Sequence, residues 1–121
     1  MKQLESAEQQ ALFQWAAYNT GRLPELSLLY HVPNGGKRDV ITAARLKAEG
    51  VKAGIPDLFL PVSRKGFHGL YVEMKAKGGR LSDYQKKWIK ELEHQGYLVL
   101  VCYGWQEASK EIQEYLEGCI C

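Results

Sequence analysis

The sequence has no long hydrophobic run, few cysteines and little net charge, and each absence excludes a class of protein. No apolar stretch approaches the roughly 20 residues that a membrane-spanning helix needs. Residues 1–5 also lack the apolar core of a secretion signal. We therefore expect a cytoplasmic protein with no membrane partner.

Cysteine and histidine are too sparse for the common structural metal sites. The three cysteines include no Cys-x-x-Cys pair, so reduced thiols are expected. No two histidines lie at the short spacing of a zinc cluster, and His68 and His94 are expected at the surface. His31, followed three residues later by Asn34, is only faintly similar to a one-metal histidine nuclease, although both side chains are candidates to line a cleft.

The chain is long enough for one domain with a hydrophobic core. Of its 121 residues 45% are hydrophobic and 11% aromatic, and it contains no repeat or low-complexity segment, so a single domain over residues 1–121 is expected. Periodicity and turn signals predict, in chain order, helix 3–18, strand 27–32, helix 39–49, strands 57–62 and 69–75, helix 82–95, strand 97–103 and helix 105–116. The order α-β-α-β-β-α-β-α is typical of an α/β protein with a mixed central sheet of about four strands flanked by helices, in which the two adjacent strands form a hairpin.

Two acidic residues and a lysine in the middle of the chain indicate metal-assisted chemistry on a phosphate. Side chains alternate along a strand, so Glu73 and Lys75 share one face of their strand, and Asp57 stands at the start of the strand before it. One or two carboxylates together with substrate phosphate suffice to hold Mg²⁺, and a neighbouring lysine can polarise the phosphate or an attacking water. Two plainer alternatives remain open: Pro56-Asp57 is a turn pair, and Glu73 with Lys75 is an exposed ion pair.

A glutamate interrupts the apolar face of the first predicted helix. At 100° per residue, one apolar stripe is formed by Leu4, Ala11, Leu12, Trp15 and Tyr18. Glu8 falls inside this stripe, where burying a carboxylate is costly unless it is paired or bound to metal, so we expect it to face the cleft. The alternative is a helix-surface carboxylate with a basic neighbour. Glu5 lies at the edge of the stripe and is expected to be solvated.

Gln85 shares the apolar face of a later helix and has two compatible roles. Ser82 to Gln85 fits a capping box, in which the Gln85 side chain turns back to the Ser82 amide. Its amide is also a candidate to orient a water or a phosphate oxygen. Tyr84 is open as a stacking platform for a base, whereas Trp88 and Trp105 are expected to pack in the core.

Basic residues gather in the sequence around Asp57 and Glu73, the acidic pair, although the net charge is only +2. A positive side near the candidate site suits a polyanion such as DNA, and we expect shape and backbone recognition rather than a sequence code. The candidate DNA-binding residues are Asn34, Lys37, Arg38, Lys52, Lys77, Arg80 and Tyr84.

The motifs in their order resemble one known family. They are Glu8, Pro33-Asn34-Gly35-Gly36, Gly50-Val51-Lys52-Ala53-Gly54-Ile55-Pro56-Asp57-Leu58, Gly69-Leu70-Tyr71-Val72-Glu73-Met74-Lys75, Ser82-Asp83-Tyr84-Gln85 and Gly96-Tyr97. Together they resemble the VRR-NUC domain of the PD-(D/E)XK nuclease superfamily over nearly the whole chain. The Val-Arg-Arg of the family name is absent, and the nearest stretch is Lys37-Arg38-Asp39-Val40.

This resemblance implies a restriction-endonuclease-like core and a DNA endonuclease that depends on Mg²⁺ or Mn²⁺. The site that it implies consists of Asp57, Glu73 and the Met74 carbonyl as metal ligands, Lys75 as the catalytic lysine, Glu8 as a group that holds or orients the metal, and Gln85. Small stand-alone members of the family look like phage or bacterial proteins that act as homodimers on branched DNA, including four-way (Holliday) junctions. The implied partners are branched DNA and a second copy, with a helicase as a further candidate, in the cytoplasm of a bacterial host if the chain is phage-encoded.

Two other classes of function remain open. A nuclease-like fold can lose catalysis and act as a non-catalytic DNA-binding module, although intact Asp57, Glu73 and Lys75 argue against that reading. A metal-dependent hydrolase acting on RNA or on small phosphates is the third possibility.

Overall fold

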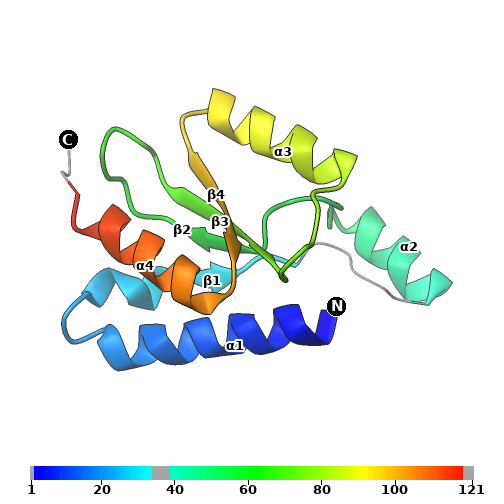
Figure 1. The fold of residues 1–121 in the computed structure, drawn as a ribbon. Coiled ribbons are helices and arrows are strands. Elements are labelled where there is room, and N and C mark those ends of the chain that lie inside the picture. Colours follow the sequence, from blue (N-terminus) through cyan, green and yellow to red (C-terminus); the bar gives the residue numbers. More distant parts are fainter. Residues whose placement is uncertain (1, 34–38, 119–121) are drawn as a thin grey trace.

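The computed structural model describes residues 2–33 and 39–118, in which helices alternate with short strands (Figure 1). In chain order the elements are α1 (Lys2–Asn19), the 3-10 helix η1 (Pro24–Leu28), β1 (Tyr30–His31), α2 (Val40–Ala48), β2 (Leu58–Leu60), β3 (Leu70–Lys75), α3 (Asp83–His94), β4 (Leu98–Tyr103) and α4 (Trp105–Leu116). Within the described residues, no helix is long and apolar enough to cross a membrane.

The strands form one mixed sheet in the order β1-β2-β3-β4. β2 pairs antiparallel with β1 and with β3, and the β2–β3 register ends with Leu58 opposite Val72. β4 pairs in parallel along the whole of β3 after the crossover through α3. The expected α/β fold with a mixed sheet and a β2–β3 hairpin is therefore confirmed.

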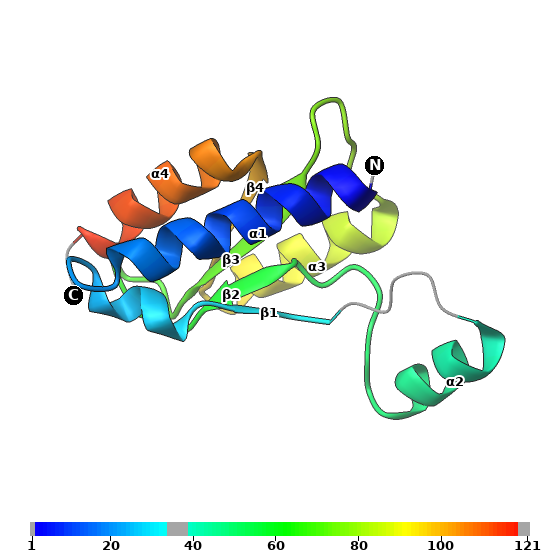
Figure 2. The ribbon, with the colours of Figure 1, turned by 90° about the horizontal axis from the view of Figure 1, so that it is seen from below.

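Helices cover the sheet on both faces. α1 and α4 lie side by side on one face, and α3 lies on the other (Figures 1 and 2). Leu70, Val72 and Met74 of β3 are buried in the core together with residues of α1 and α4. Because side chains alternate along a strand, Glu73 and Lys75 point to the opposite face, toward α3.

Helix α2 stands apart from the sheet (Figure 2), and none of its residues is buried. Its N-terminus is capped locally, because the Asp39 side chain accepts the Thr42 N–H at 2.9 Å. At that end Val40 and Ile41 are 85% and 82% exposed. The C-terminal end of the helix is bonded to the chain that leads to Asp57, because the Val51 N–H donates to the Leu46 carbonyl at 2.9 Å.

The predicted strand 27–32 is wrong over most of its length. Ser27 and Leu28 belong to η1, and the strand in this region is only Tyr30–His31. Pro24 occupies the first turn of η1, where its fixed φ favours helical geometry and its missing N–H costs nothing. Leu26 and Leu29, three residues apart, are both buried, so a helical turn packs this apolar run better than an extended strand does.

The predicted apolar stripe of α1 is also wrong at both ends. Leu4 is 61% exposed and Tyr18 88% exposed, whereas Leu12 and Ala16 are buried. The buried face is therefore rotated away from the predicted stripe and is centred near Leu12 and Ala16. Glu5 lies seven residues before Leu12, almost two full turns, and so shares this buried face.

Candidate active site

Asp57 is fixed at the point where β2 begins. Its carboxylate accepts the Met74 N–H at 2.7 Å, and its backbone carbonyl accepts the Val32 N–H at 2.7 Å. The His31 Nδ1 lies 2.9 Å from the same carbonyl and donates to it, because a carbonyl oxygen only accepts. Burial raises the pKa of Asp57 above 3.8, the Met74 N–H opposes that rise, and the negative charge of Glu5 adds to it. Asp57 is thus a partly buried carboxylate tied to β1 and β3, beyond the role of a turn residue.

Glu73 is a buried carboxylate on the face of β3 that α3 covers. It is 2% exposed, and its Oε2 accepts a hydrogen bond from Gln85 Nε2 at 2.8 Å. Burial first, and then the negative charge of Asp57, raise the pKa of Glu73 from 4.5 to about 8, against the opposing charge of Lys75. Its other oxygen, Oε1, is buried without any hydrogen-bond partner in the described structure.

Lys75 lies against the same carboxylate. Its Nζ is 3.7 Å from Glu73 Oε2, and the two side chains are only 10% and 3% exposed. The alternative of an exposed surface ion pair is therefore wrong. The lysine charge lowers the pKa of both Asp57 and Glu73 against the effect of burial, so it acts on the acidic pair as a whole.

Gln85 serves a helix cap and the acidic pair with different atoms of one amide. Its side-chain Oε1 accepts the Ser82 N–H at 2.8 Å, and the Gln85 backbone N–H donates to Ser82 Oγ at 3.1 Å, which completes a capping box. Its Nε2 remains to donate to Glu73. The cap fixes the amide so that its donor side faces the carboxylate. The predicted capping box is therefore confirmed, whereas orientation of a water or a phosphate oxygen by Gln85 stays a prediction.

The Met74 backbone points toward Asp57. The N–H and C=O of one strand residue point to the same edge of the strand, and the Met74 N–H is bonded to the Asp57 carboxylate. The β2–β3 register has already ended at Leu58 opposite Val72, so β2 does not extend opposite Met74. The Met74 carbonyl oxygen is consequently directed to the side where Asp57 lies.

Glu8 has a contact that neither sequence-based alternative anticipates. Its Oε1 accepts the Trp105 N–H, the first amide of α4, at 2.8 Å. The preceding Gly104 has a φ of +102°, and a Cβ there would lie 3.2 Å from Glu8 Oε1, so the absence of a side chain leaves room for this contact. A carboxylate at a helix N-terminus satisfies an orphan N–H and the helix dipole. Glu8 therefore joins α1 to α4.

Glu5 is the residue of α1 that sequence analysis missed. It was expected in solvent, but its charge raises the pKa of both Asp57 and Glu73, and its side chain is half-buried. The signal that could have found it is the seven-residue spacing to Leu12, the centre of the buried face of α1. Glu5 is therefore an α1 carboxylate whose charge acts on both Asp57 and Glu73.

The donor set fits one hard divalent cation with few protein ligands. In the described part of the chain, no three His, Cys, Asp or Glu side chains converge to hold a metal. Asp57 and Glu73 nevertheless repel each other when both are ionised, and Glu73 Oε1 is a buried carboxyl oxygen without a hydrogen-bond partner among the described residues. Such an oxygen is costly unless a cation compensates it, and Mg²⁺ accepts one or two carboxylates while keeping several waters.

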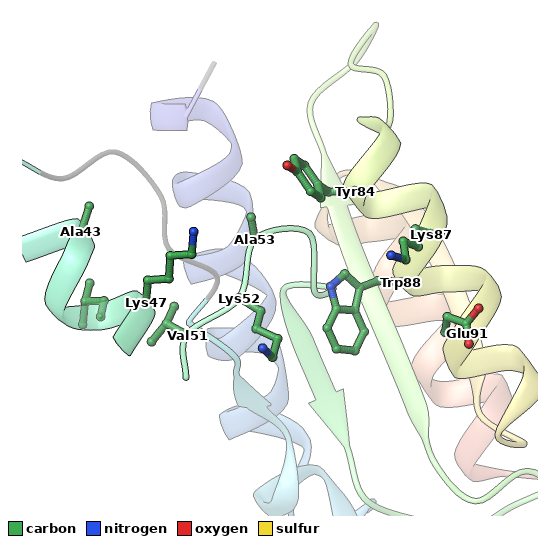
Figure 3. Close-up of a pocket in the computed structure, with 10 residues that line it drawn as sticks. Ala43, Lys47, Val51, Lys52, Ala53, Tyr84, Lys87, Trp88 and Glu91 are labelled. Atoms are coloured by element: carbon green, nitrogen blue, oxygen red, sulfur yellow. The ribbon is translucent and has the colours of Figure 1, made fainter. Parts of the chain in front are cut away.

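The predicted DNA-binding residues fall into three groups. Lys52 and Tyr84 line a pocket of about 870 Å³ between α2 and α3 (Figure 3). Lys77 and Arg80 are exposed in the turn between β3 and α3. Asn34, Lys37 and Arg38 lie outside the described residues.

The two tryptophans considered for the core differ from each other. Trp105 packs against the core cluster as expected. Trp88 is only half-buried and lines the pocket between α2 and α3, so its assignment to the core is wrong. The reason is that α2 stands away from the sheet and leaves this face of α3 uncovered (Figure 2).

Comparison with known proteins places the chain in one family. The VRR-NUC domain model matches residues 3–106. A solved structure titled VRR_NUC domain protein superposes with a TM-score of 0.75 at 27% sequence identity, over 94% of this chain and 88% of that one. No curated protein matches. VRR-NUC domains are nuclease-like, DNA-related and generally dependent on a divalent metal. The chain therefore belongs to the VRR-NUC domain family of the PD-(D/E)XK nuclease superfamily.

Proposed function

We propose that the protein is a DNA endonuclease that hydrolyses phosphodiester bonds with Mg²⁺ or Mn²⁺ and selects branched DNA such as four-way junctions. The observation that carries the proposal is the buried, unpartnered Oε1 of Glu73 beside Asp57 and Lys75. A purely structural site would gain stability by replacing this carboxylate with an apolar side chain. A buried and a partly buried carboxylate can hold a divalent cation, and the adjacent lysine can stabilise charge on a phosphate.

The proposed ligands are Asp57, Glu73 and the Met74 carbonyl. A divalent cation held there supplies Lewis-acid stabilisation of charge on the phosphate and a nucleophile at neutral pH. Gln85 keeps Glu73 oriented through the 2.8 Å bond from its capped amide. Because Lys75 Nζ lies 3.7 Å from Glu73 Oε2, it can stabilise charge on the phosphate next to the carboxylates or assist deprotonation of the attacking water.

The two α1 glutamates take different parts in this proposal. Glu5 adds negative charge at the acidic pair and so strengthens cation binding. Glu8 acts at a distance, because its bond to the Trp105 N–H fixes α1 against α4 and thereby fixes the position of Glu5. In this proposal Glu8 is a positioning residue.

The test compares two lysines two residues apart. Lys75→Ala should lower the single-turnover cleavage rate by at least about 100-fold, as loss of one positioned electrostatic group typically does, while DNA binding persists. Lys77→Ala removes the same charge from an exposed position and should weaken binding without lowering the single-turnover rate at saturating protein. Full activity of a folded Lys75→Ala protein contradicts the mechanism.

The substrate is tested with labelled four-way junction, flap, single-stranded and linear duplex DNA, in Mg²⁺, Mn²⁺ or chelator. Symmetric paired cuts restricted to the junction are expected from a homodimer acting on branched DNA. Binding without any metal-dependent cut would instead support the non-catalytic module. Competition by RNA or small phosphates that abolishes DNA cleavage would point to the third class of function.

A further inference from the structure

We propose that the pocket between α2 and α3 binds unpaired nucleotides of the DNA substrate, with a base stacked on Trp88 and phosphates held by lysines. This inference rests on the proposed action on DNA, and it specifies which part of the DNA substrate the protein binds. A base that is paired within a duplex is stacked between its neighbours and does not offer its face to a protein ring. The expected ligand is therefore a single-stranded segment, as at a flap or at the open centre of a junction.

The pocket has the size and lining of a nucleotide site. Its volume is about 870 Å³, within the range of small-molecule sites. Ala43, Leu46 and Val51 give an apolar wall from α2 and the chain after it, and Trp88 and Tyr84 lie on the opposite wall formed by α3. Figure 3 shows the Trp88 ring projecting from α3 toward Lys52. An aromatic ring facing an apolar wall can stack a base of any sequence.

The charges around the pocket favour a polyanion. Lys47, Lys52 and Lys87 line it, and Glu91 is the acidic residue among the described lining residues. Lys47 and Lys52 come from the α2 side and Lys87 from α3 (Figure 3), so positive charge flanks the aromatic ring on both sides. Basic walls that follow the backbone around an aromatic platform are the general arrangement of single-strand sites.

Both walls of the pocket are joined directly to the acidic pair. Tyr84 precedes Gln85, whose amide donates to Glu73. On the other wall, Gly54 has a φ of +93°, and a Cβ on it would lie 2.7 Å from Tyr84 backbone and side-chain carbons, so the chain leading to Asp57 touches the first turn of α3. A nucleotide in the pocket therefore lies next to the proposed catalytic site, Asp57, Glu73 and Lys75, of the same molecule.

The test measures binding without catalysis. The full chain is titrated in chelator with a fluorescently labelled oligothymidine and, separately, with a labelled duplex of the same length. Trp88→Ala should weaken oligothymidine binding by about 5- to 150-fold, the contribution of one stacked base, and change duplex binding by less than about twofold. Trp88→Phe should recover part of the affinity, because a smaller ring still stacks.

Two lysines on α3 give a matched control. Lys87→Ala removes a charge that lines the pocket, and Lys90→Ala removes the same charge from an exposed position outside the lining. Only Lys87→Ala should weaken oligothymidine binding and lower its salt slope by about one. This pair keeps the proposal testable if Trp88→Ala fails to fold, which circular dichroism detects.

Three DNA-binding results would overturn the inference. They are unchanged oligothymidine binding in a folded Trp88→Ala protein, equal loss on the duplex, and equal effects of Lys87→Ala and Lys90→Ala. Loss of a dimer on Trp88→Ala without loss of oligothymidine binding would also overturn it, because the pocket would then be an interface between copies. Since these measurements need no metal and no cleavage, their failure is distinguishable from failure of the nuclease proposal, which Lys75→Ala tests.

Discussion

Replacing Glu73 with glutamine should make the metal-free protein more stable at pH 8 and abolish its metal-dependent function. Glu73 is 2% exposed, and burial together with Asp57 raises its pKa from 4.5 to about 8. Glutamine keeps the shape of the side chain and an oxygen that can still accept from Gln85 Nε2. It removes the charge that the buried site opposes.

The size and sign of the effect follow from the two pKa values. Between about pH 4.5 and pH 8 the unfolded chain has lost the Glu73 proton and the folded chain still binds it. The free energy of unfolding of the metal-free protein is therefore highest below pH 4.5 and declines as pH rises, by about 1.4 kcal/mol per pH unit. A rise of the pKa from 4.5 to about 8 corresponds to a total on the order of 5 kcal/mol.

The Glu73→Gln variant lacks this decline. Its gain at pH 8 is smaller than the full 5 kcal/mol or so, because the new amide leaves an N–H where Oε1 had no partner, at a cost of about 1–3 kcal/mol. A net gain of about 2–4 kcal/mol remains. The same variant loses a carboxylate ligand, so Mg²⁺ should no longer stabilise it.

Urea unfolding in chelator at pH 5, 6, 7 and 8 measures the effect. Burial also raises the pKa of Asp57 from 3.8, which adds a decline of the same sign in both proteins. By contrast, the pKa of Asp39 is lowered from 3.8 by its bonds to Thr42, and burial raises the pKa of Cys102 to about 12. Repeating the series with Mg²⁺ should flatten the decline for the native chain and leave Glu73→Gln unchanged. A native protein whose stability is constant or increases from pH 5 to 8 in chelator, or a variant with the same slope, would refute the reasoning.

Two further substitutions separate scaffold from chemistry. Glu8→Gln replaces a charged acceptor by a neutral one in the 2.8 Å bond to the first amide of α4, which should lower the free energy of unfolding by about 1 kcal/mol. Folded molecules of this variant should still cleave DNA. Loss of metal binding at full stability would instead make Glu8 a metal ligand. Gly54→Ala places a Cβ 2.7 Å from Tyr84 at a φ of +93°. It should lower both the thermal unfolding midpoint and the affinity for DNA. An unchanged midpoint would show that Tyr84 and its backbone shift at no cost to make room for the Cβ.

Elements whose ends carry local signals were predicted within one or two residues. The predicted helix 105–116 coincides with α4, and the predicted helix 82–95 contains α3. Ser82 caps α3 through its side chain, and Gly96 ends it with a φ of +93°. These signals act within a few residues, so they can be recognised in the sequence without any knowledge of the rest of the fold.

Features that depend on packing between distant segments could not be predicted from the sequence. α1 is only weakly amphipathic, so its sequence does not decide which face turns inward. Contacts with β3 and α4 select the face of Leu12 and Ala16, and that choice brings the charge of Glu5 to act on Asp57 and Glu73. The motif identified Glu73 and Lys75, but their burial depends on α3, which begins eight residues later in the chain.

The acidic pair is also where the chain departs from what its fold requires. The neighbours of Glu73 compensate its charge only in part: Gln85 gives one neutral hydrogen bond, the Asp57 backbone lowers its pKa, and Lys75 stays 3.7 Å away. Met74 gives its N–H to Asp57, and Glu73 Oε1 has no hydrogen-bond partner among the described residues. A buried carboxylate with this deficit lowers stability in the absence of a cation, and a neutral side chain of the same shape would remove the deficit. The deficit is useful only if a cation fills it during the reaction, so the instability of the metal-free site and its proposed activity have the same physical origin.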